Sequence, residues 1–146
     1  MTKDYSEITL DLARELGDLC LAYAKDKGMK PLTIAVVDAA GQLKVMLRQD
    51  GTSMLRPEIA QGKARGAVGM GLGSRALYDR AQSQPYFIQA MNAIAGGSLV
   101  PVPGGVLVKS AGRIIGAIGI TGDSSDNDEA CAVHAIEAVG LTADPG

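Results

Sequence analysis

Oxygen-bearing side chains gather in the segment Gly122–Glu129, GDSSDNDE, directly before a helical pattern. Residues of these types usually cap helices, because their oxygens accept the unpaired backbone N–H groups of the first turn. The same oxygens can also line a ligand site, and Asp128 falls on the apolar side of the following helix. Both interpretations stay open. The ligand hypothesis assigns Asp126 and Glu129 to binding and Asp128 to acid–base chemistry.

The strand pattern that leads into this segment, Arg113–Thr121, contains Gly116 and Gly119. A glycine inside a strand weakens it and often marks a place where another group approaches the backbone closely. We therefore predict that Gly116 and Gly119 form one wall of a ligand site beside the acidic helix start.

A charged group surrounds the end of an earlier hairpin and the helix after it, and contains Arg48, Asp50, Lys63 and Arg65. One interpretation is an ordinary solvated face, whose exposed ion pairs contribute little to stability. The other is an anion clamp for a carboxylate, with Arg48 and Lys63 facing one cleft. The second interpretation predicts ligand-binding roles for Arg48, Asp50 and Lys63.

His134 is the only histidine of the chain. It is a candidate general base or axial iron ligand, and the alternative is a helix-edge histidine bonded to solvent or backbone. The acidic run lacks the alternate oxygens and central glycine of a calcium loop, so we predict no metal-ion site. No serine lies in a nucleophile-elbow context, and the glycines at 69–73 do not match the dinucleotide-binding fingerprint.

Hydrophobic periodicity predicts the elements that carry these residues. The predicted helices span Ser6–Lys27, Pro57–Met70, Ser74–Gln82, Pro85–Ala95 and Asp126–Val139. The predicted strands span Leu32–Val37, Gln42–Arg48, Val106–Lys109 and Arg113–Thr121. Because the strands follow one another as hairpins, we expect an α+β domain. It has a mainly antiparallel sheet with helices on its faces, including long N-terminal and C-terminal helices.

The composition limits the classes of function. A chain of 146 residues fits a single domain, residues 1–146. Its net charge of −2 and aromatic content of 3% argue against nucleic-acid binding. We find no signal peptide and no membrane span, so we expect a cytoplasmic protein. Cys20 and Cys131 are predicted to be buried free thiols.

Three segments together resemble the GlcG/HbpS-like family, which includes the C-terminal domain of PduO-type cobalamin adenosyltransferases. They are Ala35–Gly51 (AVVDAAGQLKVMLRQDG), Lys63–Ala67 (KARGA) and Gly104–Ala132 (GGVLVKSAGRIIGAIGITGDSSDNDEACA). The resemblance implies about five antiparallel strands flanked by helices, and assembly into tetramers or octamers. It also implies haem or tetrapyrrole binding in some members and an occurrence beside catabolic genes. One departure is Gln49, where the family commonly has Met.

The resemblance does not supply an axial-ligand motif for haem, so His134 and Met46 are candidates by their chemistry alone. Our leading hypothesis is a small oligomeric protein that binds haem or a small organic acid. The alternative is a cofactor-independent isomerase, hydrolase or deaminase of a small carboxylated metabolite, with Asp128 and His134 as acid and base. A third hypothesis is a purely structural subunit.

Overall fold

The structure is a computed structural model and describes residues 5–146. Its centre is one sheet of five strands in the order β2-β1-β4-β3-β5, and every neighbouring pair is antiparallel. The strands are β1 Thr33–Asp38, β2 Leu43–Arg48, β3 Gly105–Ser110, β4 Arg113–Thr121 and β5 Thr142–Asp144. The predicted α+β fold with a mainly antiparallel sheet is therefore confirmed.

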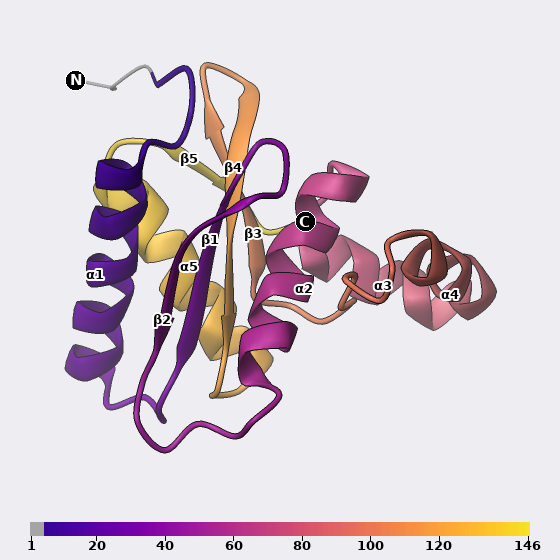
Figure 1. Cartoon of the computed structure of the whole chain (residues 1–146), viewed down its shortest axis with the longest axis horizontal. Helices are drawn as coiled ribbons and strands as arrows, with labels where there is room; N and C mark the ends of the chain where they lie inside the picture. The colour runs from indigo at the N-terminus through magenta and orange to yellow at the C-terminus, as the bar shows by residue number, and fades with distance from the viewer. Residues whose placement is uncertain (1–4) are drawn as a thin grey trace.

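Helices cover both faces of this sheet (Figure 1). They are α1 Leu10–Lys27, α2 Arg56–Met70, α3 Ser74–Ser83, α4 Pro85–Ile94 and α5 Ser125–Ala138. Alternate residues of β1 show the two layers, because successive side chains of a strand point to opposite faces. Ile34 and Val36 belong to the core under α1 and α5, whereas Val37 packs with Ala64 and Ala67 of α2.

The first helix begins later than predicted. Thr9 has an extended backbone, and its side-chain oxygen accepts a hydrogen bond from the Leu12 N–H, so it is the N-cap. The helix therefore starts at Leu10 and not at Ser6. At the other end Gly28 has φ +63° and closes the helix in the left-handed region, as its glycine predicts.

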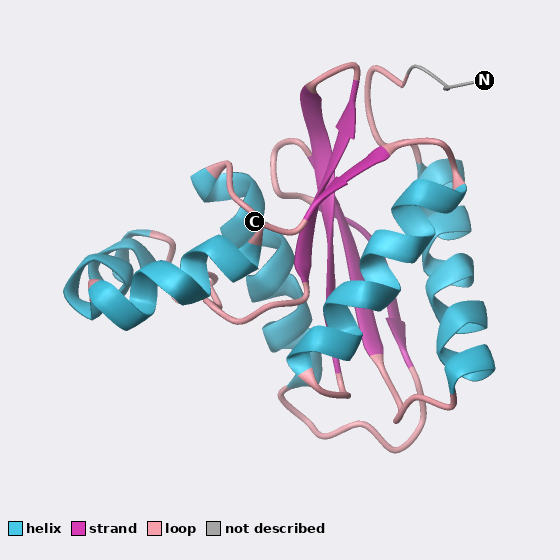
Figure 2. Ribbon diagram, turned by 180° about the vertical axis from the view of Figure 1, so that it is seen from behind, coloured by secondary structure: helices cyan, strands magenta, loops and turns pink. Residues whose placement is uncertain are grey.

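The pair α3 and α4 projects from the body of the molecule (Figures 1 and 2). Among the helices and strands of the described chain, α4 contacts α3 alone. Two of its large apolar side chains, Tyr86 and Ile94, are 69% and 79% exposed. This arm is thus an apolar surface that the rest of the described chain leaves uncovered.

The resemblance implied about five strands, but the sequence pattern did not locate the short strand β5. It pairs with β3 at the edge of the sheet, where Thr142 lies opposite Lys109 and Asp144 lies opposite Leu107. Three residues are too few to show strand periodicity in a sequence. No helix within residues 5–146 combines the length and the apolar character needed to cross a membrane.

Candidate functional site

The oxygens at the start of α5 bind local backbone groups. Ser124 is the N-cap, and its side-chain oxygen accepts from the Asn127 N–H at 3.1 Å. Asp123 accepts from the N–H groups of Lys30 and Ser124 and from the Asn127 side chain. These bonds lower the pKa of the Asp123 carboxyl, with the Lys30 N–H contributing most. Capping therefore accounts for much of the predicted oxygen cluster.

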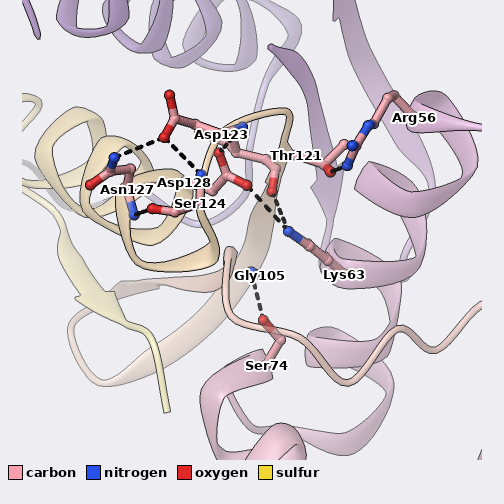
Figure 3. Close-up of polar contacts among 10 residues, drawn as sticks. Arg56, Lys63, Ser74, Gly105, Thr121, Asp123, Ser124, Asn127 and Asp128 are labelled. Atoms are coloured by element: carbon pink, nitrogen blue, oxygen red, sulfur yellow. Dashed lines mark hydrogen bonds and ion pairs between the residues drawn. The ribbon is translucent and has the colours of Figure 1, made fainter. Parts of the chain in front are cut away.

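Asp128 points inward and meets Lys63 from α2 (Figure 3). The Lys63 Nζ lies 3.5 Å from Asp128 Oδ2 and donates to the Ile120 carbonyl at 2.8 Å. Asp128 Oδ1 accepts from the Asp123 N–H at 3.0 Å. The side chains of Lys63 and Asp128 are 3% and 2% exposed, so the sheet end, α2 and α5 enclose the pair. The predicted inward carboxylate and the predicted helical cation thus meet directly.

Burial dominates the electrostatics of this pair. It lowers the pKa of the Lys63 ammonium, while the charge of Asp128 opposes that shift. It also raises the pKa of Asp128, against the opposing charge of Lys63. Each group is therefore displaced toward its neutral form. Such a pair ties α2 to α5, and removing one partner would leave an uncompensated buried charge.

The backbone at Gly104 and Gly105 packs directly against Lys63. At Gly104 (φ +122°) an added Cβ would lie 2.9 Å from Lys63 Nζ, and at Gly105 it would lie 2.3 Å from the Lys63 carbonyl. The Gly105 N–H donates to Ser74 Oγ at 2.7 Å, as Figure 3 shows. The strand β3 is therefore in direct contact with α2 and α3 here.

The glycines of β4 are also covered by protein. A Cβ at Gly119 would lie 2.0 Å from the Ala60 carbonyl oxygen of α2. A Cβ at Gly116 would lie 2.2 Å from the Val37 carbonyl oxygen and 2.4 Å from Ile8 Cδ1. The close approach predicted from these glycines exists, and the approaching groups belong to the chain itself.

Arg75 of α3 is the cation that reaches the exposed Asp126 and the half-buried Glu129 of α5. Its Nε donates to Glu129 at 2.9 Å, and its Nη2 pairs with Asp126. Glu129 first and Asp126 second raise the pKa of the Arg75 guanidinium. Sequence reasoning did not select Arg75, because nothing in a short polar helix indicates a contact with residues that are distant in the chain.

Arg48 and Asp50 lie together at a different place. They line a hollow of about 410 Å³ at the end of β2, with Met29, Pro31 and Gln49. Arg48 donates to the Thr52 carbonyl at 3.0 Å. The structure thus does not bring Arg48 and Lys63 to one cleft, since Lys63 is buried against Asp128.

His134 is exposed on the outer side of α5, away from the buried Asp128. Its ring stacks on Tyr23 of α1 with centroids 4.7 Å apart, and Lys27 Nζ lies 5.7 Å from the Tyr23 ring. These residues line a hollow of about 310 Å³ with Leu19, Ala22 and Asp26. Asp128 and His134, which were predicted as acid and base, are therefore in different environments, since Asp128 is buried and His134 is exposed.

A second hollow of about 500 Å³ continues along α1 and shares Leu19 and Ala22 with the first. We call the two together the α1–α5 trough. Its outer part is lined by Asp11, Arg14, Glu15 and Asp18. The trough therefore has an apolar centre, an imidazole on one side and charged groups around it.

Cys20, Cys131 and Met46, whose sulfur atoms could bind a metal or haem iron, are less accessible to solvent than His134. Cys20 and Cys131 are fully buried free thiols, and the Cys131 thiol donates to the Cys20 carbonyl at 3.3 Å. Met46 is half-buried on β2, opposite Ala35 of β1. Within residues 5–146 no group of three His, Cys, Asp or Glu side chains is placed to hold a metal ion.

Comparisons with known proteins agree with this fold. A family model described as haem degrading protein HbpS-like matches residues 8–137. A 15.0 kDa protein encoded between dhaT and dhaS in Citrobacter freundii is 27% identical over 138 residues, covering 93% of this chain and 94% of that protein.

Two crystal structures have the same architecture. The complex of PduOC with haem has a TM-score of 0.82 at 26% identity, covering 92% of this chain and 96% of PduOC. A double mutant of HbpS from Streptomyces reticuli has a TM-score of 0.78 at 27% identity, covering 94% of this chain and 90% of HbpS.

Proposed function

We propose that this chain, which belongs to the HbpS-like family, binds haem in the α1–α5 trough, where His134 would hold the iron. The match over residues 8–137 confirms the resemblance that the sequence motifs indicated. A similar structure of the same fold, PduOC, was crystallised as a haem complex. Bound haem would supply an iron centre for ligand binding or redox chemistry.

The observation that carries this proposal is the position of His134. Imidazole is a common axial ligand of haem iron, and His134 is the only histidine of the chain. It is exposed, so a ring nitrogen is accessible, and its stacking on Tyr23 restricts the orientation of the ring. Met46, the other candidate donor, lies on β2 outside the trough.

The remaining residues of the trough fit a flat amphipathic ligand. Leu19 and Ala22 provide an apolar floor shared by both hollows, and apolar contact is the main attraction for such a ligand. Lys27 is placed to attract a carboxylate group at the end near His134. Asp26 lies beside Lys27 at this end. The other end has three acids, Asp11, Glu15 and Asp18, and one arginine, Arg14, so the propionates are expected to point away from it.

Haem titration followed by visible absorption tests this function. We expect a shifted Soret band at stoichiometric haem for the wild type. We expect His134→Ala to change the band and weaken binding, because the iron loses its protein ligand. Met46→Ala is the matched control and should bind like the wild type. An unshifted Soret band with the wild type, or an unchanged spectrum with His134→Ala, would contradict the proposal.

We also propose that the chain self-associates through the arm of α3 and α4, in tetramers or octamers. The support is the exposure of two large apolar side chains on one helix, Tyr86 and Ile94, since such exposure is typical of protein contact sites. Light scattering would test this, since Ile94→Lys should lower the particle mass.

The two free thiols favour a reducing compartment, the cytoplasm.

A further inference from the structure

A hollow of about 310 Å³ lies on the other face of the sheet, between the β1–β2 turn and the C-terminal half of α2. The turn contributes residues 39–41, and α2 contributes Arg65, Val68 and Gly69. Ala95 and Ser98 close it from the segment after α4. This volume is at the lower end of the range for ligand pockets, about 300–1,000 Å³, so it suits a small molecule.

Arg65 is the charged group of this hollow, and most of its donors are unused. Its Nη1 makes one long hydrogen bond, 3.5 Å, to Ser98 Oγ. None of the ion pairs among residues 5–146 includes Arg65. A guanidinium has five N–H donors in a planar fork that matches a carboxylate in a two-bond arrangement. Arg65 is therefore a cation with free hydrogen-bonding capacity facing a cavity.

No acidic side chain of the described residues lines the hollow to compete for Arg65. The nearby turn contains Asp38, which accepts from the Ala40 and Gln42 N–H groups and so is engaged within the turn. The contrast with Arg75 is direct, because Arg75 is already paired with Asp126 and Glu129. An anion entering the hollow would thus meet one unpaired positive charge.

Small residues create the space in front of the guanidinium. Gly41 has φ +76°, and an added Cβ would lie 3.8 Å from Arg65 Nε, so the turn backbone packs beside the arginine. At Gly69 an added Cβ would meet no atom within 4 Å. Ala39, Ala40 and Ala95 complete a lining without large side chains. This arrangement suits a ligand whose acid group reaches Arg65 while a short carbon skeleton occupies the hollow.

We propose that this hollow is a binding site for a small carboxylic acid, with Arg65 as the group that binds its carboxylate. Arg65 lies on α2, whereas the α1–α5 trough lies on the opposite face of the sheet, so the two sites are independent. The sequence predicted a carboxylate clamp from Arg48 and Lys63, and this proposal assigns that function to Arg65.

Nuclear magnetic resonance of the full chain tests the proposal, with acetate, lactate, succinate and benzoate as probes. We expect at least one acid to shift the Arg65 Nε–H signal and the amide signals of residues 39–41. Arg65→Gln should weaken binding of that acid by about tenfold or more, which corresponds to about 1.4 kcal/mol. Arg48→Gln is the matched control and should bind like the wild type. No shift with any probe would overturn the proposal.

A second variant fills the hollow and keeps the arginine. Gly69 is exposed within α2 and an added Cβ meets open space, so Gly69→Phe can fold while its ring occupies the site. We expect Gly69→Phe to abolish the shifts, and retained binding would overturn the proposal. His134→Ala should bind the acid unchanged. Loss of acid binding in that variant would place the acid at the haem trough, which would also overturn the Arg65 site.

Discussion

Lys63 and Arg65 are two cations of the same helix, separated by one residue, and their environments are opposite. Lys63 is 2% exposed, donates to Ile120 and pairs with Asp128. Arg65 is exposed, has one long hydrogen bond and lines a hollow. Residues two apart on a helix are turned by about 200°, so one faces the sheet end and the other faces away from it.

The difference shows that position on the helix decides which cation has a structural role. A buried charge must be paired, because an unpaired charge keeps the cost of desolvation without the attraction that compensates for it. Lys63 therefore has its partner within the protein. The exposed Arg65 has no such requirement, and its donors remain available to a ligand. Variants of the two cations and of their partners test this contrast.

The largest effect is expected for Lys63→Met. It leaves the Asp128 carboxylate buried without its cation, which we expect to lower the free energy of unfolding by about 3–5 kcal/mol. Urea denaturation at pH 7 measures this. Lys44→Met, at an exposed lysine of β2, is the matched control and should stay within about 0.5 kcal/mol of the wild type.

The double variant Lys63→Met, Asp128→Asn refines that test. The introduced amide would keep an acceptor for the Asp123 N–H and would carry no charge, so the double variant should be less destabilised than the sum of the two single ones. Strict additivity, or a loss below about 1 kcal/mol for Lys63→Met, would show that the pair does not hold α2 to α5.

An intermediate effect is expected in the pH dependence of stability. The folded state raises the pKa of Asp128 above its unfolded value of 3.8. The contribution of Asp128 to the free energy of unfolding therefore grows as the pH falls through the folded pKa toward 3.8. Asp123 has a lowered pKa, so its contribution is lost as pH falls below 3.8. Denaturation experiments between about pH 7 and pH 3 distinguish the contributions of these two carboxyl groups. Asp128→Asn should lose more stability than the wild type on acidification, and Asp123→Asn should lose less. The same slope in both variants would refute this assignment.

The smallest effects are expected for Arg65 and Arg75. Arg65→Gln should change the free energy of unfolding by no more than about 0.5 kcal/mol, because no ion pair is lost. Arg75→Ala should cost about 1 kcal/mol, since Arg75 and Asp126 are partly and largely exposed, whereas Glu129 is mostly covered. Thermal unfolding compares the two. A large destabilisation by Arg65→Gln would mean that Arg65 is part of the packing.

Local signals in the chain were enough for most of the fold. Apolar periodicity predicted the helices and four of the five strands, because one face of each must be buried. Gly28 ends α1, and the glycines of β4 mark close approach. Each of these signals depends on neighbours within about ten residues, so it can be recognised without the tertiary structure.

The site depended on contacts between distant residues. Lys63 pairs with Asp128 from another helix, and Arg75 and Glu129 are 54 positions apart in the chain. The sequence identified Lys63 and Asp128 as candidates, but their pairing, the helix that covers Gly119 and the open cavity at Arg65 follow from the packing of α2 on the sheet. A linear pattern reports which face a residue occupies. Which residue of another element it contacts there depends on how the helices pack on the sheet, because only packing brings charges from different elements within a few ångströms.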